Sequence, residues 1–435
     1  MQFEPCRVHS GRPAPGAVSD GSNTMNTETL QSPTAHIHTP HLSIAPDGRT
    51  STVTARIDLQ GTSVDLWYTF HGMVAEPSPD AFIPAVLLAA MLHGVPLVSE
   101  GPVSPLLLSQ LPTVQDIYAT WVPTLKRIPI EAPSAERTSG PGHETAAFFT
   151  GGIDSFHTFL THRAEIGTLL FVHGFASPRT GERRDSASRT LQAVGEAFGV
   201  RVIEVESNLY RLLDLWLEAK QRGDLSPRFS NFELAHGAAM ASVAHLLPDS
   251  FGRVYVAASD TYSDLVPWGS HPLLDPLWST ERRRLVHDGC AATRVEKTRT
   301  VTGSDRALEL LRVCPKAGLT DPPNCGRCEK CLRTMVGLRI VGGLDRCPAF
   351  AEKLDLRRVS LTRNTPVADQ CLRENLVAAK ALGSDPALVA ALERALRPRA
   401  LSRLPLELLN AGWKLTRRIL PVEYVNGRIR WRHAG

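Results

Sequence analysis

The chain has 435 residues, 43% of them hydrophobic and 21% charged, a composition that excludes a globally disordered protein. Its formal net charge of +4 is too small to indicate nucleic-acid binding by itself. No charged segment followed by an apolar one opens the sequence, and proline and glycine residues interrupt its most apolar run, 81–98. We therefore expect a cytoplasmic protein without a secretion signal or a transmembrane segment.

The N-terminal region lacks periodicity and is rich in Gly, Pro, Ser, Thr and His, which predicts a disordered tail over residues 1–45. His36, His38 and His41 alternate within this region. A metal site is one interpretation of that spacing, and a solvated tail is the one we favour.

A small α+β module is predicted over residues 46–131, because apolar side chains first alternate and then recur at helical spacing. A two-stranded hairpin, two helices and a short third strand are expected at 53–59, 64–70, 81–92, 104–121 and 127–130. The module contains no distinctive chemical motif, so we expect it to pack against the rest or to gate substrate. A Pro-, Ser- and Gly-rich linker follows at 132–143.

Short apolar strands alternate with helical lengths over residues 144–340, which predicts an α/β fold with a doubly wound parallel sheet. The expected strands are 146–150, 168–173, 200–206 and 253–258, and the expected helices lie near 155–165, 185–198, 208–221 and 232–246. Ligands bind beyond the carboxyl ends of the strands in such sheets. The segments expected at that edge are 150–155, 173–175 and 259–260.

The segment Thr150-Gly-Gly-Ile-Asp-Ser155 joins the first of these strands to the first helix. Gly151 and Gly152 would let a phosphate approach the backbone, and unpaired N–H groups at the start of the helix favour an anion. We expect Asp154 or Ser155 to cap the helix and the Ser155 hydroxyl to donate to a phosphate. An ordinary glycine-rich turn is the alternative, since short motifs often match by chance.

Four cysteines follow with the spacing C-x₁₀-C-x₂-C-x₂-C: Cys314, Cys325, Cys328 and Cys331. Four thiolates suit a closed tetrahedral Zn²⁺ site, and an iron–sulfur cluster is the alternative. Basic residues next to these cysteines are expected to offset the charge of the thiolates: Arg327, Lys330 and Arg333.

Residues 146–338 resemble the PP-loop ATP pyrophosphatases, and within them the 7-cyano-7-deazaguanine (preQ0) synthase branch. Thr150–Ser155 matches the S-G-G-x-D-S loop, and Asn231–Ala235 resembles the helix before the fourth strand. Ala258–Asp264 resembles the substrate loop, and the four cysteines match the zinc site of that family. These features cover less than half of the chain.

The resemblance implies an ATP-dependent carbon–nitrogen ligase that uses ATP, Mg²⁺ and a structural Zn²⁺. A small carboxylic acid would attack the α-phosphate to give an acyl-adenylate and pyrophosphate, and ammonia or an amine would displace AMP. Candidate catalytic residues are Asp154, Ser155, Asp260, Asp264 and Lys297, with Asp154 also a candidate magnesium ligand. Candidate ATP-binding residues are Thr150, Gly151, Gly152, Ser155 and His173.

Several candidates have a structural alternative. Asp260 and Asp264 could ligate a metal, ammonia or substrate, or could cap a turn. Lys297 follows the strand-like segment 294–296 and could reach a phosphate or lie in solvent. His173 could be a core histidine, the interpretation we favour, and His271 lies in a loop that could close over substrate.

The chain departs from the family pattern at Thr150, at Ser230 and in the segment 265–275, so we expect adenylating chemistry on a different acid. One alternative is a tRNA-modifying or sulfur-transfer PP-loop enzyme. That reaction needs a reactive cysteine outside the zinc cluster, and Cys290, the nearby candidate, has no activator evident in the sequence. A catalytically inactive nucleotide-binding partner module is the other alternative.

Residues 341–435 are predicted to form a helical, basic extension that includes the helix-like segment 367–396. Lys and Arg are frequent from Arg394 to Arg432, with Trp and Tyr between them. RNA or an anionic membrane surface could bind there, and a solvated or partner-covered extension is the alternative. The sequence also allows a homodimer.

Overall fold

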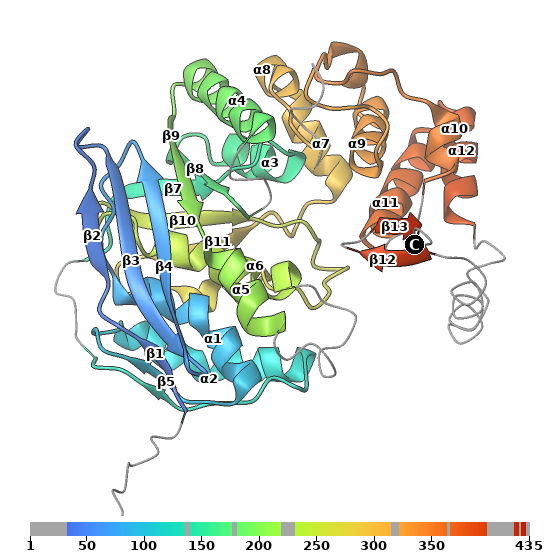
Figure 1. Ribbon diagram of the computed structural model, residues 1–435. Coiled ribbons are helices and arrows are strands. Elements are labelled where there is room, and N and C mark those ends of the chain that lie inside the picture. The colour runs from blue at the N-terminus through green and yellow to red at the C-terminus, as the bar shows by residue number, and fades with distance from the viewer. Residues whose placement is uncertain are drawn as a thin grey trace, which may run out of the picture.

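The computed structural model describes residues 33–134, 140–175, 181–218, 231–314, 322–362, 366–397, 422–425 and 428–431. Within these residues the protein belongs to the α/β class, as predicted. A mixed, mostly parallel sheet of eleven strands forms its centre, and helices pack on the sheet (Figure 1). None of the helices in the described part is long and apolar enough to cross a membrane.

Five parallel strands form one half of the sheet, in the order β11-β10-β7-β8-β9. Their bounds are β7 Glu144–Phe148, β8 Ile166–His173, β9 Arg201–Ser207, β10 Phe251–Ala257 and β11 Arg284–Asp288. Strands β8 and β9 are added on one side of β7, and β10 and β11 are then added on its other side. The direction in which the chain adds strands therefore reverses at β7. In open α/β sheets, ligands bind beyond the carboxyl ends of the strands at such a reversal. The four predicted strands are confirmed, whereas β11, which carries three polar residues, had no clear pattern.

The four predicted helices of this half are also confirmed: α3 Ile153–Thr161, α4 Glu182–Phe198, α5 Leu209–Glu218 and α6 Asn231–Ala244. Apolar packing fixes α3, because Phe156 and Phe159 contact Phe149 edge-on at ring-centroid distances of 4.8 and 6.0 Å. Helix α6 lies close to the loop that follows β10: a Cβ atom on Gly237 would come within 2.3 Å of the Gly269 oxygen. Only glycine fits there.

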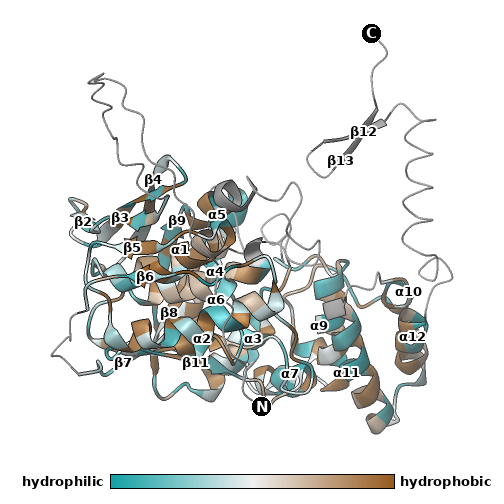
Figure 2. Ribbon diagram, turned by 90° about the horizontal axis from the view of Figure 1, so that it is seen from below, coloured by the Kyte–Doolittle hydropathy of each residue, from teal (hydrophilic) through white to brown (hydrophobic). Residues whose placement is uncertain are grey.

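The N-terminal strands extend the same sheet. The predicted hairpin is formed by β3 (Thr50–Leu59) and β4 (Thr62–His71), and β4 pairs antiparallel with β9. The other elements here are β5 Leu97–Ser99, β6 Ile130–Glu131, a short 3₁₀ helix η1 Pro79–Ala81, α1 Phe82–His93 and α2 Pro105–Trp121. Helix α1 is buried along almost its whole length, which explains the apolar run in the sequence, and Figure 2 shows it largely in the colour of hydrophobic residues.

The prediction of a disordered tail is wrong for residues 33–45, which form β1 (Ala35–Ile37) and β2 (His41–Ile44). Strand β1 lies between β3 and β5, and both Ala35 and Ile37 are fully buried. A strand of three residues is too short to show alternation, so its partners, rather than its own sequence, determine it. Residues 1–32 lie outside the described part.

The C-terminal part is helical (Figure 1): α7 Arg294–Thr302, α8 Asp305–Glu309, α9 Glu329–Ile340, α10 Leu356–Ser360, α11 Pro366–Leu382 and α12 Pro386–Leu396. Two further 3₁₀ helices are η2 Asp275–Trp278 and η3 Leu344–Arg346. The strand-like prediction for 294–296 is wrong, because Thr293 and Glu296 form a capping box that starts α7.

The helix-like segment 367–396 is two helices. Gly383 has a φ of +66° just after α11 ends, and the Asp385 side chain caps α12. Most of the basic tail lies outside the described residues; within it the antiparallel pair β12 (Val422–Val425) and β13 (Arg428–Trp431) is described.

Candidate active site

The segment Thr150–Ser155, here called the glycine loop, follows the carboxyl end of β7 and leads into α3. Gly151 has a φ of +78°, a conformation that favours glycine, and Gly152 is the N-cap of α3. Among the described residues no side chain caps this helix, so our expectation of a cap from Asp154 or Ser155 is wrong. The Ser155 hydroxyl instead donates to the Gly152 carbonyl over 3.1 Å and accepts from the Thr150 N–H over 3.3 Å. The first backbone N–H groups of α3 are therefore available to a hydrogen-bond acceptor from outside the chain.

Arg312 covers one side of this loop, a neighbour that the sequence did not indicate. Its N–H donates to the Gly151 carbonyl over 2.7 Å, and a Cβ atom on Gly151 would come within 3.2 Å of the Arg312 Cβ. Burial lowers the pKa of the guanidinium, while the nearby Cys314 raises it. The buried Nε of Arg312 has no hydrogen-bond partner in the described part of the chain.

Asp154 lies in the first turn of α3 and faces two cations from α7. Arg294 donates to Asp154 Oδ2 over 2.6 Å, and Lys297 Nζ lies 3.9 Å from Oδ1. Burial opposes the charge of Arg294, but Asp154, Cys371 and Glu329 together outweigh burial and raise its pKa. The alternative of a solvated Lys297 is wrong: its side chain is 1% exposed and donates to the Ala258 carbonyl over 2.7 Å.

Helix α9 contributes two more cations: Arg333, which is buried, and Lys330, which is exposed. Desolvation of its ammonium group first, and then the charges of Arg333 and Arg294, lower the pKa of Lys330. Arg333 lies 3.4 Å from both the Cys371 sulfur and a Glu329 oxygen.

The expectation that Arg327, Lys330 and Arg333 offset the charge of the thiolates is therefore not supported. Arg327 pairs with Glu352, and the other two face the group around Asp154. Arg312 interacts electrostatically with one sulfur of the cluster, that of Cys314.

The two acids after β10 have different surroundings. Burial, followed by the charge of Asp154, raises the pKa of Asp260, which places Asp260 near the glycine loop. Asp264 is exposed and accepts from Thr261 Oγ1 and Ser263 Oγ over 3.0 and 2.8 Å, the arrangement of a turn cap.

A cavity of about 800 Å³ opens beside Asp264. It lies between the segment Ser263–Val266, the start of α7 and one face of α11, and it combines apolar side chains with Arg299, Arg373 and Glu374. Glu374 also accepts from the Arg294 N–H over 2.7 Å, which links the wall of the cavity to the pair formed by Asp154 and Arg294.

Two predicted histidines are buried. His173, at the end of β8, is 0% exposed, and its Nε2 lies 2.6 Å from Glu204, which supports the core interpretation. His271 does not lie on an open lid, because its ring packs edge-on against Trp121 of α2 and its Nδ1 accepts from the Leu273 N–H.

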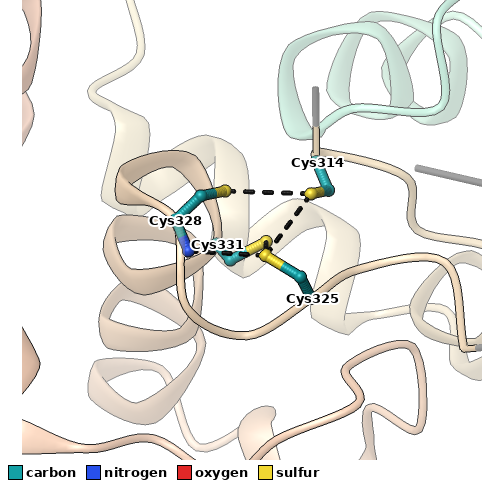
Figure 3. Close-up of side chains that lie close together, drawn as sticks. All are labelled: Cys314, Cys325, Cys328 and Cys331. Carbon is teal, nitrogen blue, oxygen red and sulfur yellow. Dashed lines mark hydrogen bonds between the residues drawn. The ribbon is translucent and has the colours of Figure 1, made fainter. Parts of the chain in front are cut away.

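The four predicted cysteines converge on one point (Figure 3). Sulfur–sulfur distances are 3.6 Å for Cys314–Cys325, 3.8 Å for Cys314–Cys328 and 3.9 Å for Cys325–Cys331. A tetrahedron with Zn–S bonds of about 2.3 Å has edges of about 3.8 Å. These distances are far too long for disulfides and fit one ion better than a cluster in which each cysteine binds a different iron.

Local structure explains how the cysteines meet. Cys328 is the N-cap of α9, so the last two cysteines start that helix. The fully buried Asn324 accepts from the Val313 and Cys314 N–H groups over 2.8 and 3.0 Å and donates to the carbonyls of Leu311 and Ala349. Its amide thereby joins the Cys314 segment to the Cys325 segment. A hydrogen bond from the Cys331 side chain, despite burial, lowers the pKa of Cys328 to about 5.

The chain matches no protein-family model, and no curated protein and no solved structure is significantly similar to it.

Proposed function

We propose that this protein is a PP-loop ATP pyrophosphatase that activates a small carboxylic acid as an acyl-adenylate and passes the acyl group to ammonia or an amine. In this proposal the parallel half of the sheet has the PP-loop architecture, and the glycine loop binds the phosphates of ATP. The acid would not be a deazapurine, because the segment 265–275 differs from the preQ0 synthase pattern and packs against α6 and α2.

The main support is a pair of partly buried arginines next to an uncapped helix start. Within the described residues, the Nε atoms of Arg294 and Arg312 are buried without a hydrogen-bond partner. A buried charged donor without a partner costs free energy, so these two N–H groups call for an anionic acceptor. A polyphosphate placed over Gly151 and Gly152 would meet the helix N–H groups and the Arg312 side chain together.

The surrounding residues fit the chemistry. Lys297 and Arg294 could stabilise the charge that develops on pyrophosphate as its bond to the α-phosphate breaks. Asp154 and Asp260 are the carboxylates that would hold Mg²⁺, which would neutralise phosphate charge. The cysteine cluster would hold a structural Zn²⁺ that fixes the start of α9 and so the positions of Lys330 and Arg333.

Pyrophosphate release tests the proposal. The full-length protein is incubated with ATP, Mg²⁺ and a panel of carboxylic acids, with and without ammonia, and pyrophosphate and AMP are measured. We expect equal amounts of both products with at least one acid. ATP binding without release for any acid would instead favour the inactive nucleotide-binding module, and absence of ATP binding would refute the proposal.

Arg312→Gln provides a sharper test of the binding geometry. Loss of a charged hydrogen bond worth about 1.5–3 kcal/mol should weaken ATP binding by roughly 10- to 100-fold in calorimetry. Arg306→Gln is the matched control, since Arg306 is 68% exposed on α8 and pairs with Glu309. Equal ATP affinity in the two variants would contradict the proposed position of the phosphates.

A further inference from the structure

Two histidines and two carboxylates come together on the N-terminal half of the sheet. His36 lies in β1, directly opposite Asp58 of β3 in the antiparallel register. His38 follows β1, and its N–H donates to a carbonyl of β3 over 3.0 Å, which continues that pairing. Glu100 follows β5 on the other side of β1, and its N–H donates to a β1 carbonyl over 3.0 Å. Backbone hydrogen bonds of three neighbouring strands therefore fix the positions of all four residues.

The strands also determine which way the histidines point. Side chains two residues apart lie on the same face of a strand. Ala35 and Ile37 point into the core, so His36 and His38 point to the opposite face, where their side chains are 29% and 30% exposed. The interpretation of these two histidines as part of a solvated tail is therefore wrong, whereas His41 of β2 is exposed.

The polar atoms of this group lie about as far apart as the ligands of one ion. His38 Nε2 lies 2.6 Å from Asp58 Oδ2, and the ring centroids of His36 and His38 are 4.5 Å apart. One ligand atom from each of these three residues lies within 4.8 Å of the other two. A tetrahedral ion with bonds of about 2.0–2.1 Å has ligand atoms about 3.3 Å apart. Rotation of the side chains, without movement of the strands, covers the difference.

Glu100 is placed to orient His38. Its Oε1 lies 2.9 Å from His38 Nδ1, and its Oε2 accepts from the Thr39 N–H over 2.9 Å. A histidine that binds a metal commonly donates its other ring N–H to a carboxylate, which fixes the ring and directs the free nitrogen to the ion. Here that free nitrogen is Nε2, which faces Asp58.

Charge also favours a cation at this face. Arg56 contacts Asp58 through Oδ1, over 3.2 Å, and leaves Oδ2 towards His38. With both histidines neutral, the two carboxylates exceed the charge of Arg56 by one unit.

We propose that His36, His38 and Asp58 form a metal site separate from the cysteine cluster, and that it takes one divalent transition-metal ion of the zinc class. Imidazole nitrogen combined with a carboxylate suits Zn²⁺, whereas Mg²⁺ and Ca²⁺ prefer oxygen ligands alone. Three protein ligands leave one coordination position for water or another small ligand. Strands β3 and β4 lie between β1 and β9, so the site is distinct from the glycine loop and does not depend on the proposed function.

Zinc content tests the site. Full-length protein is dialysed against buffered Zn²⁺, and the metal bound per chain is measured together with circular dichroism. We expect two ions in the wild type and in Cys328→Ser one ion fewer, still held by the histidines. His36→Ala and His38→Ala should each lose one ion, and the matched control His41→Ala should lose none. Wild-type zinc content in both His36→Ala and His38→Ala would overturn the inference, as would an equal loss in His41→Ala.

Two further measurements distinguish a metal site from a set of ion pairs. Glu100→Gln should weaken Zn²⁺ affinity at this site by about 10- to 100-fold in calorimetry, the usual effect of losing the carboxylate partner of a metal-ligating histidine. Zn²⁺ should raise the melting temperature of Cys328→Ser, and this increase should disappear when His38→Ala is added. Unchanged Zn²⁺ affinity in Glu100→Gln would refute its orienting role, and the same increase with and without His38→Ala would refute the site.

Discussion

Replacing Gly151 with alanine tests the glycine loop most directly. An alanine at a φ of +78° costs about 1–2 kcal/mol relative to its preferred conformations. The new Cβ atom would lie 3.2 Å from the Arg312 Cβ, so the Arg312 segment must move by a few tenths of an ångström, at a cost of order 1 kcal/mol. We expect a loss of about 2–3 kcal/mol in unfolding free energy and at least a ~10-fold loss of ATP affinity, because the phosphate cradle is displaced.

Gly342→Ala separates backbone strain from the loop itself. Gly342 has a φ of +75°, and a Cβ atom there would meet no atom within 4 Å in the described structure. Gly342→Ala should therefore lose about 1–2 kcal/mol of stability and keep its ATP affinity. Denaturant unfolding and calorimetric titration with ATP and Mg²⁺ measure the two effects. If Gly151→Ala bound ATP as tightly as Gly342→Ala, our account of the loop would be refuted.

Three further outcomes are expected. Asp154→Asn should abolish pyrophosphate release while the protein stays folded in circular dichroism; turnover at the wild-type rate would show that the carboxylate is not needed. Cys328→Ser should lose zinc in metal analysis and melt at a lower temperature, whereas Cys347→Ser should retain the metal; equal metal contents would place the zinc elsewhere. Burial opposes, but Asp275 and Cys290 together raise, the pKa of His287 to about 9, so the folded state binds this proton more tightly than the unfolded state does. The tighter binding of this proton adds up to about 3 kcal/mol to the unfolding free energy. This stabilisation is complete below pH 6.5 and is lost as the pH rises through 9. The unfolding free energies of the wild type and of His287→Gln are measured by denaturation as a function of pH, and their difference should fall as the pH rises. A difference that does not change with pH would exclude this contribution of His287 to stability.

The cysteine cluster and the glycine loop are mechanically connected. Arg312 contacts the loop, and Cys314 follows two residues later in a segment that Asn324 ties to Cys325. Helix α9 begins at the cluster and carries Lys330 and Arg333 towards Asp154. Metal removal should therefore weaken ATP binding as well as stability, because the ion would fix cations on both sides of the loop.

The sequence by itself determined the parallel strands, their helices, the glycine loop and the four cysteines. Each of these has a local cause: continuous apolar runs make buried strands, a glycine at positive φ makes the tight turn, and cysteine spacing sets which sulfurs share an ion. The sequence pattern did not predict elements that are stabilised mainly by their neighbours. One example is the three-residue strand β1, which lies between β3 and β5.

Only the tertiary structure decided which charged groups meet. Lys297, 143 residues after Asp154, and Arg312, 161 residues after Gly151, reach the loop because α7 and the segment after α8 pack at the end of the parallel strands. Asp275 and His287 meet in the same way, through η2 and β11. Electrostatic contacts depend on distance in space, and sequence spacing reports that distance only within one helix, strand or turn.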